Sequence, residues 1–248
     1  MQTRICPVTP IAVVLSLVLA CGCASPRKAA PLTVHGPVAP ADEVARDGWQ
    51  RPQAIVAQMR LQPGQVVVDF GAGTGYLLQH LSRAVSPSGQ VIAVEIQPEL
   101  VQRLRQRVSD EGLRNVTVVQ STEVSAALGQ LADRIVLLHS YGELDHPIDM
   151  LAALKQWLRP GGRLYAVEFL PPPDPVGLPM PLSDPDHRVA PDTLEAEMRG
   201  AGLVATQRYA VLPHQYFAMF VPTEELTPAL AQDRDRVGAP EAVTPAAR

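Results

Sequence analysis

A short apolar run that ends in an acidic residue, followed by three closely spaced glycines, constrains this chain more than any other feature. The valines at 66–68 precede Asp69, and glycines stand at positions 71, 73 and 75 before a helical pattern begins. An unbroken β-branched run favours a strand buried in a parallel sheet. Glycines after such a strand permit a tight turn and close approach of a ligand to the backbone. The pattern predicts a strand, turn and helix that bind a nucleotide-like cofactor.

A second acidic residue ends the next apolar run. Residues 91–95 read VIAVE and end in Glu95. A carboxylate at the tip of the second strand of a nucleotide-binding sheet accepts hydrogen bonds from ribose hydroxyls. The G-x-G-x-G spacing differs from the G-x-G-x-x-G of dinucleotide-binding loops, whose helix N-terminus holds a pyrophosphate. The spacing therefore argues against an NAD-dependent oxidoreductase.

Together these residues resemble motif I and the following acidic motif of class I methyltransferases that depend on S-adenosylmethionine (SAM). The resemblance covers about residues 45 to 222 and includes LRPGGRL at 158–164. DGWQRPQAI at 47–55 and HQYFAMF at 214–220 are similar to a bacterial subgroup of predicted methyltransferases. The resemblance to class I methyltransferases implies that SAM is the cofactor. It also implies that Asp69 and the glycine loop bind the methionine end of SAM and that Glu95 binds its ribose. The cofactor-binding residues that it implies are Asp69, Gly71, Ala72, Gly73, Gly75, Glu95, Ile96, Thr122 and Glu123.

The segment Ser121, Thr122 and Glu123 has two interpretations. In the family this region contacts the adenine, whereas Ser or Thr followed by an acid is also a common helix cap. The sequence leaves both open.

Strand and helix patterns alternate along the chain, which predicts an α/β fold with helices on both faces of a mostly parallel sheet. We expect a Rossmann-like, doubly wound, seven-stranded sheet that ends in an antiparallel hairpin, as in class I methyltransferases. A chain of 248 residues with 46% hydrophobic residues suits one such core. The expected helices are 53–60, 76–85, 98–110, 147–158 and 191–201, and the expected strands are 66–70, 91–95, 116–119, 134–139, 163–168, 203–210 and 215–221.

The densest cluster of titratable groups is HSYGELDHP at 139–147, after the fourth expected strand. His139 is a candidate general base or a contact of the SAM amino group, and Tyr141 is a candidate contact of the methyl acceptor. A hydrogen-bonded structural residue is the alternative for His139. Glu143, Asp145 and His146 are further candidate contacts of the acceptor, and the alternative for them is a solvated loop or helix cap. The proline-rich stretch 169–188 either lies over the pocket or is a rigid surface connection.

Other function classes find little support in the sequence. The histidines show no metal-ligand spacing, so we expect no metal. The net charge of -4 provides no basic stripe for a nucleic acid. The acceptor is a small molecule, a lipid or a protein, and the sequence does not distinguish them.

The N-terminus predicts export. Arg4 precedes an apolar segment at 11–20, and VLAC at 18–21 resembles the lipobox of bacterial lipoproteins, which implies lipidation of Cys21. We expect a signal peptide at 1–20, an Ala- and Pro-rich tether at 21–45, a methyltransferase-like domain at 46–222 and a flexible tail at 223–248. This organisation predicts a lipid-anchored protein of the bacterial envelope, at the outer membrane or the periplasmic face.

Two alternatives concern this location. A misassigned start codon would make the protein cytoplasmic. Because SAM is made in the cytoplasm, an exported chain would also be consistent with a non-catalytic scaffold of the same fold that binds another small molecule or a protein.

Overall fold

The computed structural model describes residues 40–122, 128–172 and 188–226. The predicted signal peptide, Cys21, Glu123, most of the proline-rich stretch and nearly all of the predicted tail lie outside the described residues. No described helix has the length and apolar character needed to cross a bilayer.

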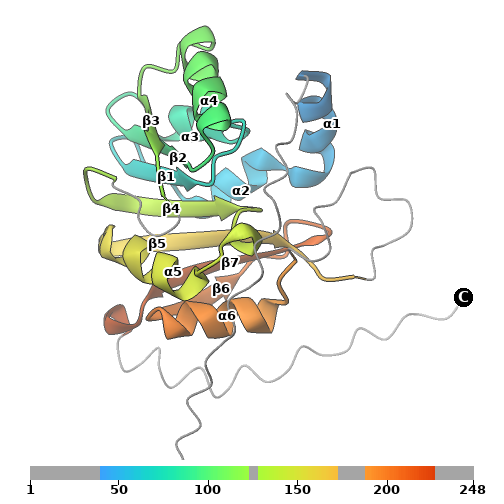
Figure 1. Ribbon diagram of the computed structural model, residues 1–248, viewed down its shortest axis with the longest axis vertical. Helices are drawn as coiled ribbons and strands as arrows, with labels where there is room; N and C mark the ends of the chain where they lie inside the picture. Colours follow the sequence, from blue (N-terminus) through green and yellow to red (C-terminus); the bar gives the residue numbers. More distant parts are fainter. Residues whose placement is uncertain (1–39, 123–127, 173–187, 227–248) are drawn as a thin grey trace, which may run out of the picture.

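The described residues form one seven-stranded sheet with helices on both sides (Figure 1). Its strand order is β3-β2-β1-β4-β5-β7-β6. The strands are β1 (Val66–Phe70), β2 (Gln90–Glu95), β3 (Val116–Gln120), β4 (Ala132–Leu138), β5 (Leu158–Phe169), β6 (Leu203–Arg208) and β7 (Gln215–Pro222). The helices are α1 (Pro40–Gln50), α2 (Pro52–Met59), α3 (Leu78–Val85), α4 (Pro98–Asp110), α5 (Pro147–Gln156) and α6 (Pro191–Gly200), with short 3-10 helices η1 (Tyr141–Glu143) and η3 (Thr223–Glu225).

The expected fold class is confirmed. Strands β1 to β5 pair in parallel, whereas β7 runs antiparallel to both β5 and β6. The strand order reverses between β1 and β4, and open α/β sheets bind ligands at such a switch point, beyond the carboxyl ends of the strands. The predicted C-terminal hairpin is also present, with β6 at the edge of the sheet.

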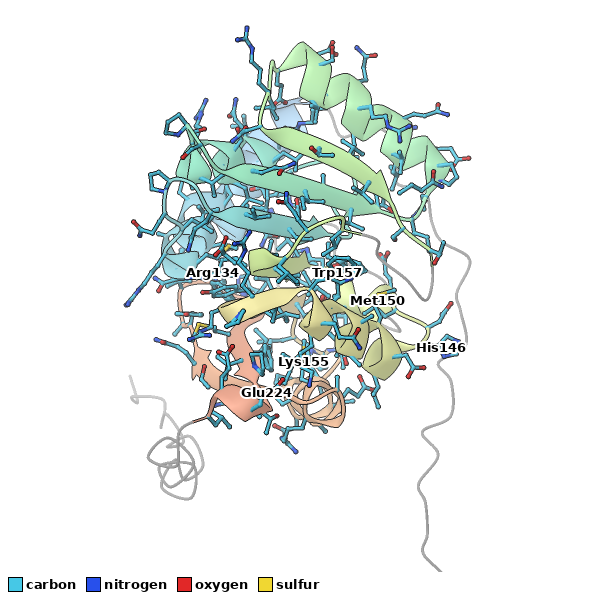
Figure 2. All side chains as sticks on the ribbon, turned by 90° about the vertical axis from the view of Figure 1, so that its left-hand side faces the viewer. Arg134, His146, Met150, Lys155, Trp157 and Glu224 are labelled. Carbon is cyan, nitrogen blue, oxygen red and sulfur yellow. The ribbon has the colours of Figure 1, made fainter. Side chains whose placement is uncertain are left out.

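An apolar core lies on each face of the sheet, because alternate residues of each buried strand point to opposite faces. These two cores hold the layers together. On one face, Val67 of β1 packs with α2, α3 and α4 through residues such as Ile55, Leu81 and Leu104. On the other face, Val68 packs with α5 and α6 through residues such as Leu151, Leu154, Leu194 and Met198. On this second face Lys155 of α5 also forms an ion pair of 3.5 Å with Glu224 of η3 (Figure 2).

Two boundaries differ from the sequence-based expectation. Helix α1 begins at Pro40, inside the segment that we assigned to a tether through residue 45. Strand β5 begins at Leu158, where we expected the end of a helix and a turn. Leu158 pairs with Ala132, and the register then shifts so that Arg163 pairs with Arg134. Gly161, with a φ of 77°, lets the chain bulge between these pairs, so the glycines bend a strand that has already started.

Candidate functional site

The candidate site lies at the carboxyl edge of the parallel strands, around the switch point between β1 and β4. Helix α1 lies at the side of the molecule toward which the arrowhead of β4 points (Figure 1). The glycine loop that follows β1 is fixed to the neighbouring strand, because the N–H groups of Gly71 and Ala72 both donate to the carbonyl of Val94 at 2.9 Å.

The three motif glycines have different surroundings. A Cβ on Gly71 would lie 2.3 Å from the Cβ of Ser140, and one on Gly75 would lie 2.9 Å from Leu78 and 3.0 Å from Leu104. A Cβ on Gly73 would meet nothing within 4 Å. Gly71 and Gly75 therefore serve close packing, whereas Gly73 borders open space that is available to a ligand.

Glu95 binds the glycine loop directly. Its Oε2 accepts a hydrogen bond from the N–H of Gly73 at 2.8 Å, and its Oε1 accepts from Ile96 at 2.8 Å and Gln97 at 3.0 Å. A carboxylate offers about four acceptor directions. One direction remains on Oε2, so a ribose hydroxyl can donate to Glu95 without breaking the contacts that hold the loop.

Asp69 is buried beneath the same loop, with 3% of its surface exposed. Burial raises the pKa of Asp69 to about 7, although the charge of Arg46 on α1 opposes the rise and that of Glu95 adds to it. A cationic group close to this carboxylate, such as the ammonium of an amino acid, would stabilise its charged form.

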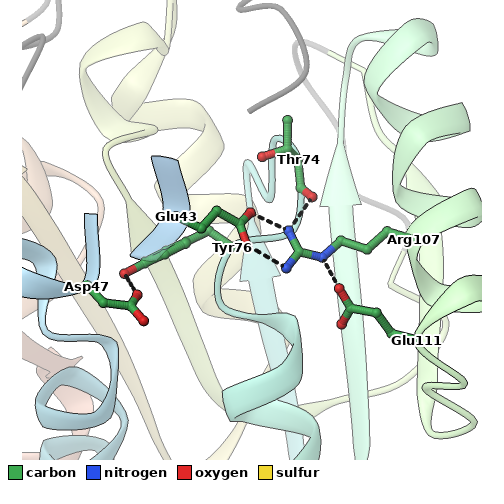
Figure 3. Close-up of polar contacts among 6 residues, drawn as sticks. All are labelled: Glu43, Asp47, Thr74, Tyr76, Arg107 and Glu111. Atoms are coloured by element: carbon green, nitrogen blue, oxygen red, sulfur yellow. Dashed lines mark hydrogen bonds and ion pairs between the residues drawn. The ribbon is translucent and has the colours of Figure 1, made fainter. Parts of the chain in front are cut away.

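Helix α1 is attached to the glycine loop by a network of polar contacts (Figure 3). Glu43 accepts two hydrogen bonds from Arg107 of α4, at 2.6 and 3.0 Å. Arg107 also donates to the carbonyl of Thr74 at 3.1 Å, and the hydroxyl of Tyr76 donates to Asp47 at 2.6 Å. These contacts join α1, the loop and α4 into one unit at the edge of the proposed cofactor site.

An aromatic cluster lies beside this unit. The ring of His139 stacks on Phe169 at a centroid distance of 4.0 Å, and Trp49 of α1 lies 6.4 Å from His139 and 6.0 Å from Phe169. Phe169 ends β5 and His139 directly follows β4, so the cluster belongs to the same edge of the sheet. Of these three residues the sequence pattern indicates only His139, because nothing local connects it to Trp49 or Phe169.

His139 is a neutral imidazole in this environment. Burial, helped by the positive charge of Arg46, lowers the pKa of His139 to about 3. Its Nε2 lies 3.3 Å from Oε1 of Gln215, an oxygen that also accepts from Gln50, so the Nε2-protonated tautomer fits best. So weak a base holds few protons at neutral pH, and the geometry favours positioning over general base catalysis.

The contacts of Tyr141, which we predicted to contact the methyl acceptor, are structural ones in the described residues. Its side chain is fully buried among residues of α5 and α6, and its hydroxyl donates to Glu197 of α6. Its N–H donates to Glu168 at 2.8 Å. The ring is thus packed in the core beside α6, and a sequence pattern alone does not reveal such packing.

The other predicted site residues differ in how far they are exposed. Ile96 is partly buried beside Glu95, Thr122 is exposed, and the N–H of Ser121 donates to the carbonyl of Glu95 at 2.9 Å. His146 is exposed where α5 begins, as the loop or helix-cap interpretation expects (Figure 2). Among the described residues no three His, Cys, Asp or Glu side chains gather as metal ligands.

Unpartnered buried polar atoms mark the same edge. In the part of the chain that the structure describes, the buried side-chain atoms without a hydrogen-bond partner are Nε of Arg46, Oε1 of Gln50, Oε1 of Gln97 and Nε2 of Gln215. These residues come from α1, the tip of β2 and the start of β7, and all lie at the carboxyl edge. Because buried polar groups are normally paired, such a concentration indicates a place where a polar ligand binds.

Comparisons with known proteins agree with this geometry. A family model described as a methyltransferase domain matches residues 44–208. The ubiquinone/menaquinone biosynthesis C-methyltransferase UbiE of Bordetella parapertussis is 30% identical over 114 residues, which cover 46% of this chain and 44% of that protein. The UbiE of Burkholderia cenocepacia is 27% identical over 121 residues, 49% of this chain and 50% of that protein. The chain thus spans about half the length of these curated relatives.

Solved structures show the same fold. A SAM dependent methyltransferase from Aquifex aeolicus superimposes with a TM-score of 0.64 at 23% identity, covering 74% of this chain and 98% of that one. The glycopeptide N-methyltransferase MtfA, in complex with SAM, has a TM-score of 0.55 at 17% identity and covers 69% and 92%.

Proposed function

The chain belongs to the methyltransferase domain family, and from this premise we propose that it transfers a methyl group from SAM to an acceptor at the carboxyl edge of its sheet. The observation that carries this proposal is the open space at Gly73, in the loop that follows the buried Asp69 and whose N–H is held by the carboxylate of Glu95. The residues present fit SAM. Asp69 suits the ammonium of its amino acid end, Glu95 suits its ribose, and SAM has no phosphate. When bound, SAM supplies an electrophilic methyl group on its sulfonium.

The protein's own residues bind and orient the cofactor. Glu95 accepts from a ribose hydroxyl through the acceptor direction left on Oε2, and the ammonium of the methionine portion faces Asp69. Methyl transfer proceeds in line, so correct placement of two reactants provides much of the acceleration without a base. This agrees with a neutral His139, which stacks on Phe169 and does not remove a proton.

We propose a small-molecule acceptor with a flat or lipophilic part that contacts Trp49, His139 and Phe169. Offset ring stacking contributes about 0.5–1.5 kcal/mol for each pair. The unpartnered Oε1 of Gln50 and Nε2 of Gln215 provide one acceptor and one donor for polar groups of the same molecule. The curated relatives are named for ubiquinone and menaquinone biosynthesis, which is consistent with an acceptor of this kind. A lipid or protein acceptor is the alternative.

The proposed location is the bacterial envelope, with the chain anchored through a lipid on Cys21. Its support is the sequence of residues 4–21. Metabolic labelling with a radioactive fatty acid tests it: label should enter the wild-type chain and be absent from Cys21→Ser. Absence of label in both, with the protein in the cytosolic fraction, would favour the cytoplasmic alternative.

Calorimetric titration of the purified protein with SAM, S-adenosylhomocysteine and NAD tests the cofactor. We expect binding of SAM and S-adenosylhomocysteine and none of NAD. If a folded sample bound neither SAM nor its product, the non-catalytic scaffold would become the better interpretation.

A further inference from the structure

Arg46 is placed over the glycine loop by helix α1. Its guanidinium carbon lies 3.9 Å from the centroid of the Tyr76 ring and 5.7 Å from that of Trp49. Tyr76 directly follows Gly75, so the charge lies beside the end of the glycine loop. No sequence pattern points to Arg46, which directly follows the expected tether at 21–45.

The charge of Arg46 has no ion-pair partner among the described residues. Its Nε is buried without a hydrogen-bond partner, and burial lowers the pKa of Arg46. Glu43 and Asp47 of α1 are engaged elsewhere, since Glu43 binds Arg107 and Asp47 binds Tyr76. Desolvating a guanidinium without an anionic partner is costly, even where an aromatic face offers part of the compensation. This arrangement suits a site that receives an anion from a ligand.

Arg46 and Asp69 provide opposite charges at one end of the cofactor site. They are close enough for the positive charge of Arg46 to lower the pKa of Asp69. The methionine portion of SAM is a zwitterion with an ammonium and a carboxylate on the same carbon. A fixed negative group and a fixed positive group match these charges in one orientation only.

We infer that Arg46 binds the α-carboxylate of SAM, as the partner of Asp69, which faces the α-ammonium. This inference rests on the proposed function, because it assigns a further residue to the same cofactor site. The inference also explains the role of α1. The contacts of Glu43 with Arg107 and of Asp47 with Tyr76 hold this helix so that Arg46 points into the site.

Two ligands that differ only in the carboxylate test this assignment. The full chain is titrated with SAM and with decarboxylated SAM, for the wild type, Arg46→Gln and Arg46→Lys. A matched control is Arg199→Gln, which removes an exposed positive charge from α6. A charged hydrogen bond predicts that Arg46→Gln weakens SAM binding by about 10- to 100-fold. Decarboxylated SAM should bind Arg46→Gln and wild type within about threefold, and Arg46→Lys should retain part of the preference for SAM.

The outcomes separate this inference from the proposed function. If Arg46→Gln weakened both ligands equally, Arg46 would act only by holding α1 in place, and the inference would fail. Unchanged binding of SAM to Arg46→Gln would also overturn it. If the folded wild type bound neither ligand, the proposed function itself would fail. Thermal melts of all variants establish that each sample is folded.

Discussion

Gln50 and Gln215 are 165 residues apart in the sequence, yet Nε2 of Gln50 donates a hydrogen bond of 2.7 Å to Oε1 of Gln215. Both side chains are buried. Gln50 ends α1 and Gln215 begins β7, so this contact joins the first described helix to the last strand. The two sequence segments that resemble a methyltransferase subgroup, 47–55 and 214–220, therefore meet in space at the carboxyl edge of the sheet.

Breaking this pair should destabilise the domain. Gln215→Leu leaves the Gln50 amide buried without its partner, which costs about 1–3 kcal/mol. The double variant Gln50→Leu with Gln215→Leu should cost less than the sum of the single variants, because it removes the Gln50 amide that Gln215→Leu leaves without a partner, while the loss of the His139 contact is common to both. Urea unfolding measures the three free energies. Strict additivity would mean that the hydrogen bond contributes nothing to the fold.

Gly71→Ala and Gly73→Ala should differ although both positions have positive φ angles, of 73° and 57°. Each substitution should lower the free energy of unfolding by about 1–2 kcal/mol, because alanine tolerates the left-handed backbone less well than glycine. Gly71→Ala also forces a Cβ to 2.3 Å from Ser140, so we expect a further loss of about 1–3 kcal/mol. Ser140→Gly should recover part of that further loss, and thermal melts measure it. Gly73→Ala should instead weaken SAM binding, because its methyl group enters the open space.

Glu95→Gln should weaken SAM binding by about 1–3 kcal/mol. The amide has one oxygen where the carboxylate has two, so either the N–H of Gly73 or the N–H groups of Ile96 and Gln97 lose their acceptor. Glu99→Gln in the exposed first turn of α4 is the matched control for charge. Calorimetry measures affinity, and hydrogen exchange of the Gly73 amide reports on the loop. Equal SAM affinity in both variants and the wild type would remove Glu95 from the site.

Asp69→Asn should stabilise the protein at pH 8 more than at pH 5. Burial raises the pKa of Asp69 from 3.8 to about 7, so the folded state binds more protons than the unfolded state between these values. The stability from the protonated form is therefore present below about pH 4 and is lost as the pH rises through 7. Asparagine removes the cost of the buried charge, which is a few kcal/mol at pH 8.

Thermal melts at the two pH values check this expectation, with the exposed Asp149→Asn as control. The same variant should bind SAM more weakly, because the ammonium loses its partner. A melting temperature of Asp69→Asn below that of the wild type at pH 8 would contradict the assigned cost of ionisation.

The ion pair between Glu43 and Arg107 should determine how firmly α1 is held. Because both side chains are about one fifth exposed, we expect Glu43→Gln to loosen the helix by about 1 kcal/mol. Backbone amide hydrogens of α1 should then exchange with solvent about fivefold faster, while the exchange rates of those in β1 stay unchanged. Glu111→Gln is the control, since it removes another carboxylate from Arg107 but none from α1. Faster exchange of α1 in both variants would mean that the total charge matters and not the contact.

Local patterns predicted most of the sheet. β1 and β2 end at Phe70 and Glu95, close to the expected ends, because an unbroken apolar run followed by a turn is a local signal. The tether predicted through residue 45 overlaps α1, which begins at Pro40. That helix is fastened by Glu43 and Asp47 to partners far along the chain, and a local pattern does not contain such contacts.

The sequence by itself determined the fold class, the glycine loop and the two acidic strand tips, since each depends on residues adjacent in the chain. Only the tertiary structure decided which side chains share the site. It buried Tyr141 against α6, and it brought Trp49 and Gln50 to His139 and Gln215. The direction of a side chain depends on how the layers pack, and packing joins residues whose separation in the sequence carries no periodic signal.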